Sequence, residues 1–313
     1  RWFWFEPPFH GGQSALLHRQ PDDTWRIDFQ IGIEADARKE QEPERVRARL
    51  DRMLEGRDYS LVWVSVYKFQ CRRMENFRHG RVFFAGDSAH QVSPFGARGA
   101  NSGLEDAENI AWKLDLVLKG EAPESLLDTY HLERSAAADM NIGHSTRSTD
   151  FISPKGPAAI GYRNAVLDLS RRFDFARRMV NSGRLSTPAT YETPLSTPDA
   201  DTFAGAARLG APLPDAPLRN VDGFDVWLLE ALGDDFTLIV FADGAAPAVP
   251  DGVTLLDIGA GWSDPKGMLA ERLDATPGAT YLVRPDQHLA ARWRHYDPAL
   301  VAAALDRAKG IVK

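Results

Sequence analysis

The segment GRVFFAGDSAHQVSPFGARGANSGLEDAENIAWKL, residues 80–114, decides how this 313-residue sequence is interpreted. Residues 81–85 predict a short, fully buried strand, and Gly86 and Asp87 follow it directly. A carboxylate at the end of a buried strand needs hydrogen-bond donors, because leaving it unpaired costs roughly several kcal/mol. The donors for Asp87 are either a neighbouring helix N-terminus or the hydroxyl groups of a ligand, and the residues themselves leave both open.

The loop after Asp87 strengthens the ligand interpretation. Gly86 has no side chain, so the backbone can approach a ligand closely there. Residues 94–103, PFGARGANSG, place glycines and an asparagine directly before a predicted helix. The start of a helix presents unpaired N–H groups and a partial positive charge, which suits an anion or a polarisable carbonyl. The spacing matches neither G-x-x-x-x-G-K-[ST] nor G-x-G-x-x-G, the common phosphate-binding patterns.

The helix after this loop has a strong amphipathic pattern. Its carboxylates Glu105, Asp106 and Glu108 are either a paired-carboxylate site or acidic residues of the first turn that stabilise the helix dipole, and the second interpretation is favoured. His90 is interpreted as a packing or hydrogen-bonded histidine rather than a catalytic base. The apolar stripe expected to face the core consists of Leu104, Ala107, Ile110, Ala111, Leu114, Val117 and Leu118.

Residues 80–114 resemble the second flavin-binding motif of the class A flavoprotein aromatic hydroxylases. This is the p-hydroxybenzoate hydroxylase-like family, which includes phenol hydroxylase and 3-(3-hydroxyphenyl)propionate hydroxylase. The family pattern reads G-R-V, two hydrophobic residues and A-G-D-A-A-H, then P-x-G-x-G-x-N, then D-A-x-N-L-A-W-K-L. Ser88 stands where the family usually has alanine.

The resemblance implies roles for individual residues. Asp87 would accept a hydrogen bond from a ribityl hydroxyl of FAD, and Pro94 would lie over the flavin ring near the substrate. The N–H groups around Gly99, Ala100 and Asn101 would face the N1–C2 carbonyl edge of the flavin. The full set of implied cofactor-binding residues is Gly86, Asp87, Pro94, Gly96, Arg98, Gly99, Ala100 and Asn101.

The resemblance also implies an activity. It is that of an FAD-dependent monooxygenase that hydroxylates a phenolic aromatic compound with NAD(P)H and O₂, through a flavin hydroperoxide. No catalytic base is identified. Weak candidates for the substrate side, besides Pro94, lie on the front strands: Gln13, His18, Asp28 and Gln30. A non-catalytic binding or assembly module derived from a flavoprotein, or an epoxidase or halogenase of the same superfamily, remains an alternative.

No G-x-G-x-x-G follows a strand in these residues, and the chain begins with strand-like RWFWF and no methionine. We therefore expect the family's ADP-binding portion to precede Arg1, and a homodimer is possible. The formal net charge of −7 argues against nucleic acid and anionic membrane as partners. The single cysteine, Cys71, suggests a reducing, cytoplasmic setting, and no metal-ligand spacing is present.

The expected fold class is α/β. Residues 1–182 would form a partial FAD-binding and substrate domain of p-hydroxybenzoate hydroxylase-like fold, and residues 183–220, rich in Pro, Ser, Thr and Gly, a linker or surface-wrapping segment rather than packed structure. Residues 281–293, YLVRPDQHLAARW, resemble the end of the thioredoxin-like C-terminal domain of the phenol hydroxylase branch. The resemblance therefore implies a thioredoxin-like domain without C-x-x-C at residues 221–313. The parts of the first domain are a substrate sheet at 1–70, with an alternating strand at 61–69, the flavin motif and helix at 80–120, and helices at 123–182.

The C-terminal domain, residues 221–313, carries the clearest secondary-structure signals outside the flavin motif. Residues 236–241 and 253–258 predict buried parallel strands, residues 279–285 and 288–294 predict a hairpin over a Pro-Asp turn, and residues 298–310 predict a closing helix. Thiol redox chemistry is excluded there, because the domain contains no cysteine.

Overall fold

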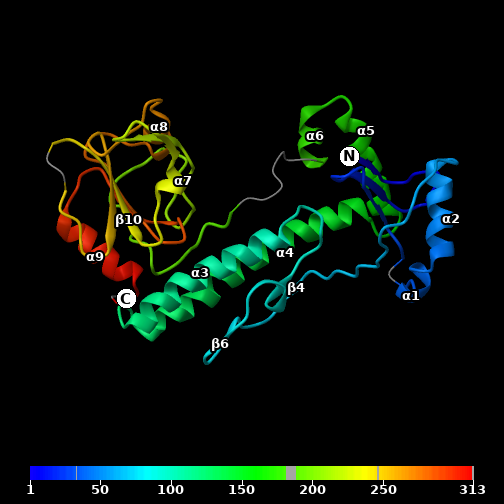
Figure 1. Ribbon diagram of the computed structural model, residues 1–313, viewed down its shortest axis with the longest axis horizontal. Helices are drawn as coiled ribbons and strands as arrows, with labels where there is room; N and C mark the ends of the chain where they lie inside the picture. Colours follow the sequence, from blue (N-terminus) through cyan, green and yellow to red (C-terminus); the bar gives the residue numbers. More distant parts are fainter. Residues whose placement is uncertain (33, 181–187, 245–246, 312–313) are drawn as a thin grey trace. The chain divides into compact units, whose positions relative to one another are not determined.

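The computed structural model describes residues 1–32, 34–180, 188–244 and 247–311. These residues form two compact units (Figure 1). The first unit contains residues 1–71, 92–96 and 144–185, and the second contains residues 72–91, 97–143 and 186–313. No described helix is both long and apolar enough to cross a lipid bilayer.

The first unit opens with a three-stranded antiparallel sheet. Its strands are β1 (Trp2–Trp4), β2 (Ala15–Arg19) and β3 (Trp25–Phe29), in the order β1-β2-β3. Helices α1 (Ala37–Glu40) and α2 (Pro43–Leu54) follow. The end of α4 (Asp128–Ile152), α5 (Pro157–Ser170) and α6 (Asp174–Val180) complete the unit.

The strand predicted at residues 61–69 is wrong. No strand is assigned between residues 59 and 71, and Val62 and Trp63 are 82% and 80% exposed. The sequence has the alternating pattern of a strand, but a strand exists only when it pairs with another. No described residue pairs with this segment, so it remains an extended coil.

The flavin-motif segment lies in the second unit, except for residues 92–96. Two short antiparallel pairs flank it. Strand β4 (Arg72–Arg73) pairs with β7 (His90–Gln91), and β5 (Arg78–His79) pairs with β6 (Val82–Phe83). The helices of this part are η1 (Gly86–Ser88), α3 (Gly99–Lys119), η2 (Glu124–Leu127) and the start of α4.

The prediction of a fully buried strand at residues 81–85 is therefore wrong. Strand β6 covers two residues of it, Val82 is 55% exposed, and Ala85 is also exposed. The physical reason is that β6 has one neighbour, β5, and belongs to a two-stranded ribbon rather than to the interior of a sheet.

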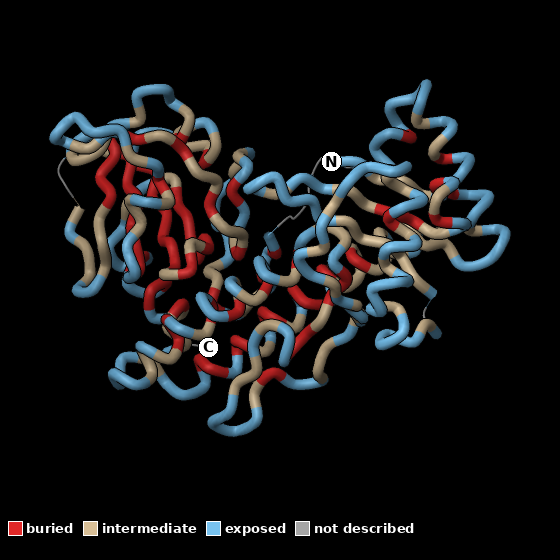
Figure 2. Tube along the Cα trace, turned by 45° about the vertical axis from the view of Figure 1, so that its right-hand side comes forward, coloured by how far each residue is buried: buried red, intermediate tan, exposed pale blue. Residues whose placement is uncertain are grey.

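The C-terminal part of the second unit is built on a seven-stranded sheet in the order β14-β13-β10-β11-β12-β8-β9. The predicted parallel pair is confirmed as β10 (Phe236–Phe241) beside β11 (Val253–Ile258), and the predicted hairpin as β13 (Thr280–Val283) with β14 (Leu289–Trp293). Figure 2 shows how deeply these strands are buried. The remaining elements are β8 (Pro217–Asn220), β9 (Asp225–Trp227), β12 (Trp262–Ser263), α7 (Leu228–Ala231), α8 (Met268–Leu273) and the closing helix α9 (Pro298–Ala308).

The order β14-β13-β10-β11, with α9 closing the chain, fits the thioredoxin-like domain that the resemblance implied. The prediction that residues 183–220 are unpacked is wrong for the described residues 188–220. Leu195, Leu213 and Leu218 are all at least 95% buried in the two hydrophobic cores that pack on the seven-stranded sheet. At Gly210, a β-carbon would come within 2.0 Å of the Tyr191 carbonyl oxygen, so these two backbone segments are in direct contact.

Candidate flavin-binding site

The start of helix α3 is a site with unsatisfied donors. Arg98 occupies the position before the first helical residue, and its side chain makes no capping hydrogen bond. The N–H groups of the first turn, which contains Gly99, Ala100 and Asn101, have no carbonyl one turn earlier to bind. Asn101 is exposed and donates from Nδ2 to the carbonyl of Ala97 (3.2 Å).

The Arg98 side chain adds an unpaired cation to this helix start. The residue is only 8% exposed, and its Nε and Nη1 atoms are buried without a hydrogen-bond partner among the described residues. Burial lowers the pKa of Arg98 from its ordinary value. Because a buried polar group without a partner is costly, this arrangement is a place for an anionic or carbonyl-bearing ligand.

The turn at Gly86 packs directly against the first turns of α3. Gly86 has a φ of 57°, in the left-handed region that favours glycine. A β-carbon on Gly103 would lie 3.4 Å from the Gly86 α-carbon, so a side chain beyond a single carbon at position 103 would press on the turn. From α4, Tyr130 donates its hydroxyl hydrogen to the Phe84 carbonyl (2.7 Å), which fixes the segment between β6 and the turn.

Asp106 is the anchor of this turn. Its Oδ2 accepts hydrogen bonds from the Gly86 N–H (2.8 Å) and from His90 Nε2 (2.6 Å), and its Oδ1 accepts from Arg134 Nε (2.6 Å). Burial by itself would raise the pKa of Asp106, but the His90 hydrogen bond and the Arg134 charge hold that pKa below its ordinary value. His90 is confirmed as a hydrogen-bonded histidine.

The first-turn placement of the acidic residues is wrong. Helix α3 begins at Gly99 and has no acidic residue in its first turn, so Asp106 lies about two turns into the helix. The glycine-rich residues 99–103, which were expected in the loop, already belong to the helix. Glu105 contacts Arg134 (3.0 Å), and burial raises the pKa of Glu108.

The prediction that the apolar stripe of α3 forms its buried face is also wrong. Leu104 and Leu118 are 70% and 80% exposed, and Ala107 and Ala111 are exposed as well. The buried residues of α3 are Ser102, Asp106, Asn109, Trp112 and Lys113. The signal that could have found this face is the polar spacing of Ser102, Asp106, Asn109 and Lys113, which recurs every three or four residues.

Asp87 follows the Gly86 turn and is exposed. Its carboxylate forms no hydrogen bond or ion pair with any described residue, so neither the predicted helix N-terminus nor another protein group supplies its donors. It lines a hollow of about 270 Å³ together with Arg72, Arg73, Met74 and residues 88–91. The free carboxylate is therefore available to a hydroxyl-bearing ligand.

The other predicted residues lie in the first unit. Pro94 is exposed and Gly96 has a φ of 101°. Among the substrate-side candidates, His18 is exposed and Gln13 is half-buried. Asp28 pairs with Arg26 on the same strand (2.8 Å).

Gln30 is already used within the first unit. Its Oε1 accepts from the Ser14 hydroxyl (2.8 Å) and the Ser14 N–H (3.2 Å), and its carbonyl lies 2.5 Å from His10 Nε2. These bonds give Gln30 a structural role in holding the sheet.

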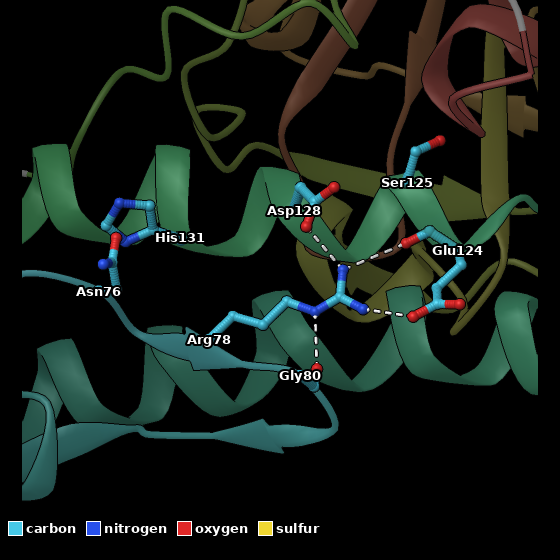
Figure 3. Close-up of a pocket in the computed structure, with 7 residues that line it drawn as sticks. All are labelled: Asn76, Arg78, Gly80, Glu124, Ser125, Asp128 and His131. Atoms are coloured by element: carbon cyan, nitrogen blue, oxygen red, sulfur yellow. Dashed lines mark hydrogen bonds and ion pairs between the residues drawn. The ribbon is translucent and has the colours of Figure 1, made fainter.

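A larger hollow of about 530 Å³ lies elsewhere in the second unit (Figure 3). Arg78 projects into it, and its guanidinium group binds the Asp128 carboxylate (2.7 Å), the Glu124 carboxylate (2.7 Å) and the Gly80 carbonyl (3.0 Å). Because these protein groups already satisfy Arg78, the hollow offers no comparable unpaired charge.

Comparisons with known proteins indicate a flavoprotein. Residues 6–145 match the family described as FAD binding domain. A 6-methylpretetramide 4-monooxygenase from Streptomyces rimosus is 32% identical, over 94% of this chain and 57% of that protein. A 4-methyl-5-nitrocatechol 5-monooxygenase from Burkholderia is 31% identical, over 72% of this chain and 43% of that protein.

A solved structure of the flavin-dependent monooxygenase PieE, in complex with FAD and substrate, is also similar. It is 26% identical with a TM-score of 0.74, over 97% of this chain and 61% of that chain. The chain is thus similar to flavin-dependent monooxygenases, which agrees with its resemblance to the class A flavoprotein aromatic hydroxylases. It spans a little over half the length of the first curated relative, the monooxygenase from Streptomyces rimosus.

The described residues fit FAD in three respects. The unpaired Arg98 guanidinium and the open start of α3 suit the electronegative edge of a flavin ring. The free Asp87 carboxylate suits a hydroxyl-rich chain. The bare backbone at Gly86 lets its turn pack against Gly103 of α3, which keeps the Asp87 carboxylate near that helix.

Proposed function

We propose that the protein binds FAD at the start of helix α3 and hydroxylates a phenolic aromatic compound with NAD(P)H and O₂. The observation that carries the proposal is the Arg98 guanidinium, which is buried and without a partner directly before an uncapped helix. Natural proteins rarely leave such a group unsatisfied unless a ligand completes it.

Each residue would have a distinct task toward the cofactor. Arg98 and the N–H groups of Gly99 and Ala100 would stabilise negative charge on the N1–C2 edge of the ring, because a fixed cation and a helix dipole need no reorganisation when that charge develops. Asp87 would accept hydrogen bonds from the ribityl hydroxyls. Gly86 would bring its backbone beside the cofactor.

Bound FAD, once reduced by NAD(P)H, would supply the activation of O₂ that these side chains cannot supply. The protein's share would be to orient the aromatic ring and exclude water. The name of the relative from Burkholderia supports a hydroxylated aromatic substrate, since it specifies a nitrocatechol. Contacts of Pro94, Gln13 and His18 with the substrate stay predictions from the resemblance.

The wider organisation is also part of the proposal. The domain boundaries at residues 182 and 220, an ADP-binding portion before Arg1 and a homodimer stay predictions. Asp28 and Gln30 are less suited to bind the substrate than Gln13 and His18, because both already have protein partners.

The test uses the intact protein with FAD and a panel of phenols and non-phenolic aromatics. We expect a phenol to stimulate NAD(P)H oxidation and to yield a product that carries one oxygen atom from ¹⁸O₂. Stimulated oxidation without an oxygenated product from any phenol would contradict the hydroxylase proposal. A protein that retains no flavin would contradict the cofactor proposal itself.

A further inference from the structure

A continuous chain of buried contacts joins the C-terminal α/β part of the second unit to the Gly86 turn. The chain passes from Tyr191 to Arg134 and then to Asp106 and the N–H of Gly86. Arg134 Nη1 donates to the Tyr191 hydroxyl oxygen (2.6 Å), and Arg134 Nε donates to Asp106 Oδ1 (2.6 Å). Arg134 and Asp106 are 0% exposed, so water cannot replace these partners.

Tyr191 is itself held by the turn between β13 and β14. Its ring stacks on His288, with 4.4 Å between ring centroids and 18° between planes. The His288 Nδ1 atom lies 2.6 Å from the Asp286 carbonyl. The orientation of Tyr191 therefore depends on this C-terminal turn.

A second set of contacts fixes the same turn to helices α3 and α4. Arg284 donates to both carboxylate oxygens of Glu133 (2.8 and 2.9 Å), and the same carboxylate accepts from Asn109 (2.7 Å) and Lys113 (2.8 Å). Burial lowers the pKa of Lys113 to about 8, against the raising effect of the Glu133 charge. The side chains of Lys113, Glu133 and Arg284 are at most 1% exposed. Such a buried and fully paired cluster holds its members in one arrangement.

We propose that the C-terminal α/β part is a positioning element of the flavin site. Tyr191 orients Arg134, Arg134 orients Asp106, and Asp106 sets the position of the Gly86 turn and thus of the Asp87 carboxylate. Tyr191 and Arg134 are positioning residues, since neither is assigned a contact with the cofactor. The inference rests on the proposed binding of FAD beside Gly86.

The chain offers a matched pair of tyrosines for the test. Tyr281 is also buried in the C-terminal part, and its hydroxyl donates to the Leu273 carbonyl (3.0 Å), within the hydrophobic core and outside this contact chain. Tyr191→Phe and Tyr281→Phe each remove one buried hydroxyl and keep the ring. Both should lower the melting temperature to a similar degree.

The dissociation constant of FAD distinguishes the two variants in the intact protein. We expect Tyr191→Phe to raise it about fivefold and Tyr281→Phe to change it less than about twofold. In an Asp106→Asn background, Tyr191→Phe should have an effect below about twofold, because the path through Asp106 is already broken.

The possible failures are separable. If the wild-type protein binds no FAD, the proposed function fails. If it binds FAD but the two tyrosine variants shift the dissociation constant equally, or Tyr191→Phe acts independently of Asp106, the positioning role is overturned. Glu105→Gln gives a second test should Tyr191→Phe not fold, because Glu105 also contacts Arg134 (3.0 Å) and is partly exposed. An unchanged dissociation constant in that variant would also count against the role.

Discussion

Asp106 Oδ2 accepts a hydrogen bond from the Gly86 N–H at 2.8 Å, so a carboxylate in the interior of helix α3 fixes the turn that presents Asp87. The same carboxylate also accepts hydrogen bonds from His90 and Arg134. The predicted ligand-binding acid and the buried structural acid are thus separate residues with separate tasks. Asp87 remains free on the surface, and Asp106 holds its turn in place.

Asp106→Asn should destabilise the protein by about 3 kcal/mol. The change leaves the buried Arg134 cation without its main counter-charge, and breaking a buried ion pair from one side usually costs about 3–5 kcal/mol. Urea unfolding measures the loss. The control is Asp139→Asn, which removes a more exposed carboxylate from Arg73 and should cost about 1 kcal/mol or less. Equal losses in both variants would refute the anchoring role of Asp106.

Gly103→Val should lower stability by about 2 kcal/mol and weaken flavin binding. The valine methyl groups would press on the Gly86 α-carbon, which a β-carbon at position 103 already approaches to 3.4 Å. Gly143→Val is the control on helix α4, where a β-carbon meets no atom within 4 Å. Thermal unfolding of the two variants measures the difference, and an equally harmful Gly143→Val would point to helix propensity instead.

The buried carboxylates should make the protein sensitive to acid. Burial alone would raise the pKa values of Glu133 and Asp286, but the Arg284 charge is the largest of the opposing effects that hold both below their ordinary values of 4.5 and 3.8. Since lowered values mean that the unfolded state binds more protons, their stabilisation is complete above about pH 5 and is lost as the pH falls below those ordinary values.

Denaturant unfolding at a series of pH values between 7 and 3 measures this loss. The Glu133→Gln variant should start less stable and lose less stability with acid than the wild type. Glu121→Gln, which changes an exposed carboxylate, should follow the wild-type curve. A Glu133→Gln variant with the wild-type pH dependence would contradict the account of the buried cluster.

Arg98→Met should make the two-electron midpoint potential of bound FAD more negative by about 30 mV. The guanidinium charge would no longer favour the anionic reduced ring, and about 30 mV corresponds to about 1.4 kcal/mol for two electrons. Arg98→Lys keeps a charge and should recover much of the potential. Spectroelectrochemical titration measures the shift. Equal potentials in wild type and Arg98→Met would contradict the proposal that Arg98 lies beside the flavin ring.

The sequence predicted the C-terminal strands well because local patterns determine them. The runs 236–241 and 253–258 are mostly apolar and are bounded by turn residues, so buried parallel strands were the simplest interpretation. The Pro-Asp turn between β13 and β14 carries its own signal. The motif at residues 80–114 indicated the resemblance to flavoprotein hydroxylases, because its residue types and spacing are unusual.

The buried face of α3 could not be predicted from local patterns. Asn109 donates a hydrogen bond to Asp286, which is 177 residues away in the chain. Its neighbour Glu133 on α4 accepts one from Arg284, which is 151 residues away. Hydrophobic periodicity counts apolar residues and has no means to show that charged residues will find buried partners. The same limit explains why segment 61–69 was predicted as a strand, since the pattern does not reveal whether a neighbour exists.

The affinity of Asp87→Asn for FAD tests the central claim most directly. Asp234→Asn changes another exposed carboxylate of the same unit and is the control. Titration of the deflavinated intact protein, followed by flavin fluorescence, should give a dissociation constant about tenfold higher for Asp87→Asn and unchanged for Asp234→Asn. The same dissociation constant for wild type and both variants would contradict the claim that the Asp87 carboxylate binds the cofactor.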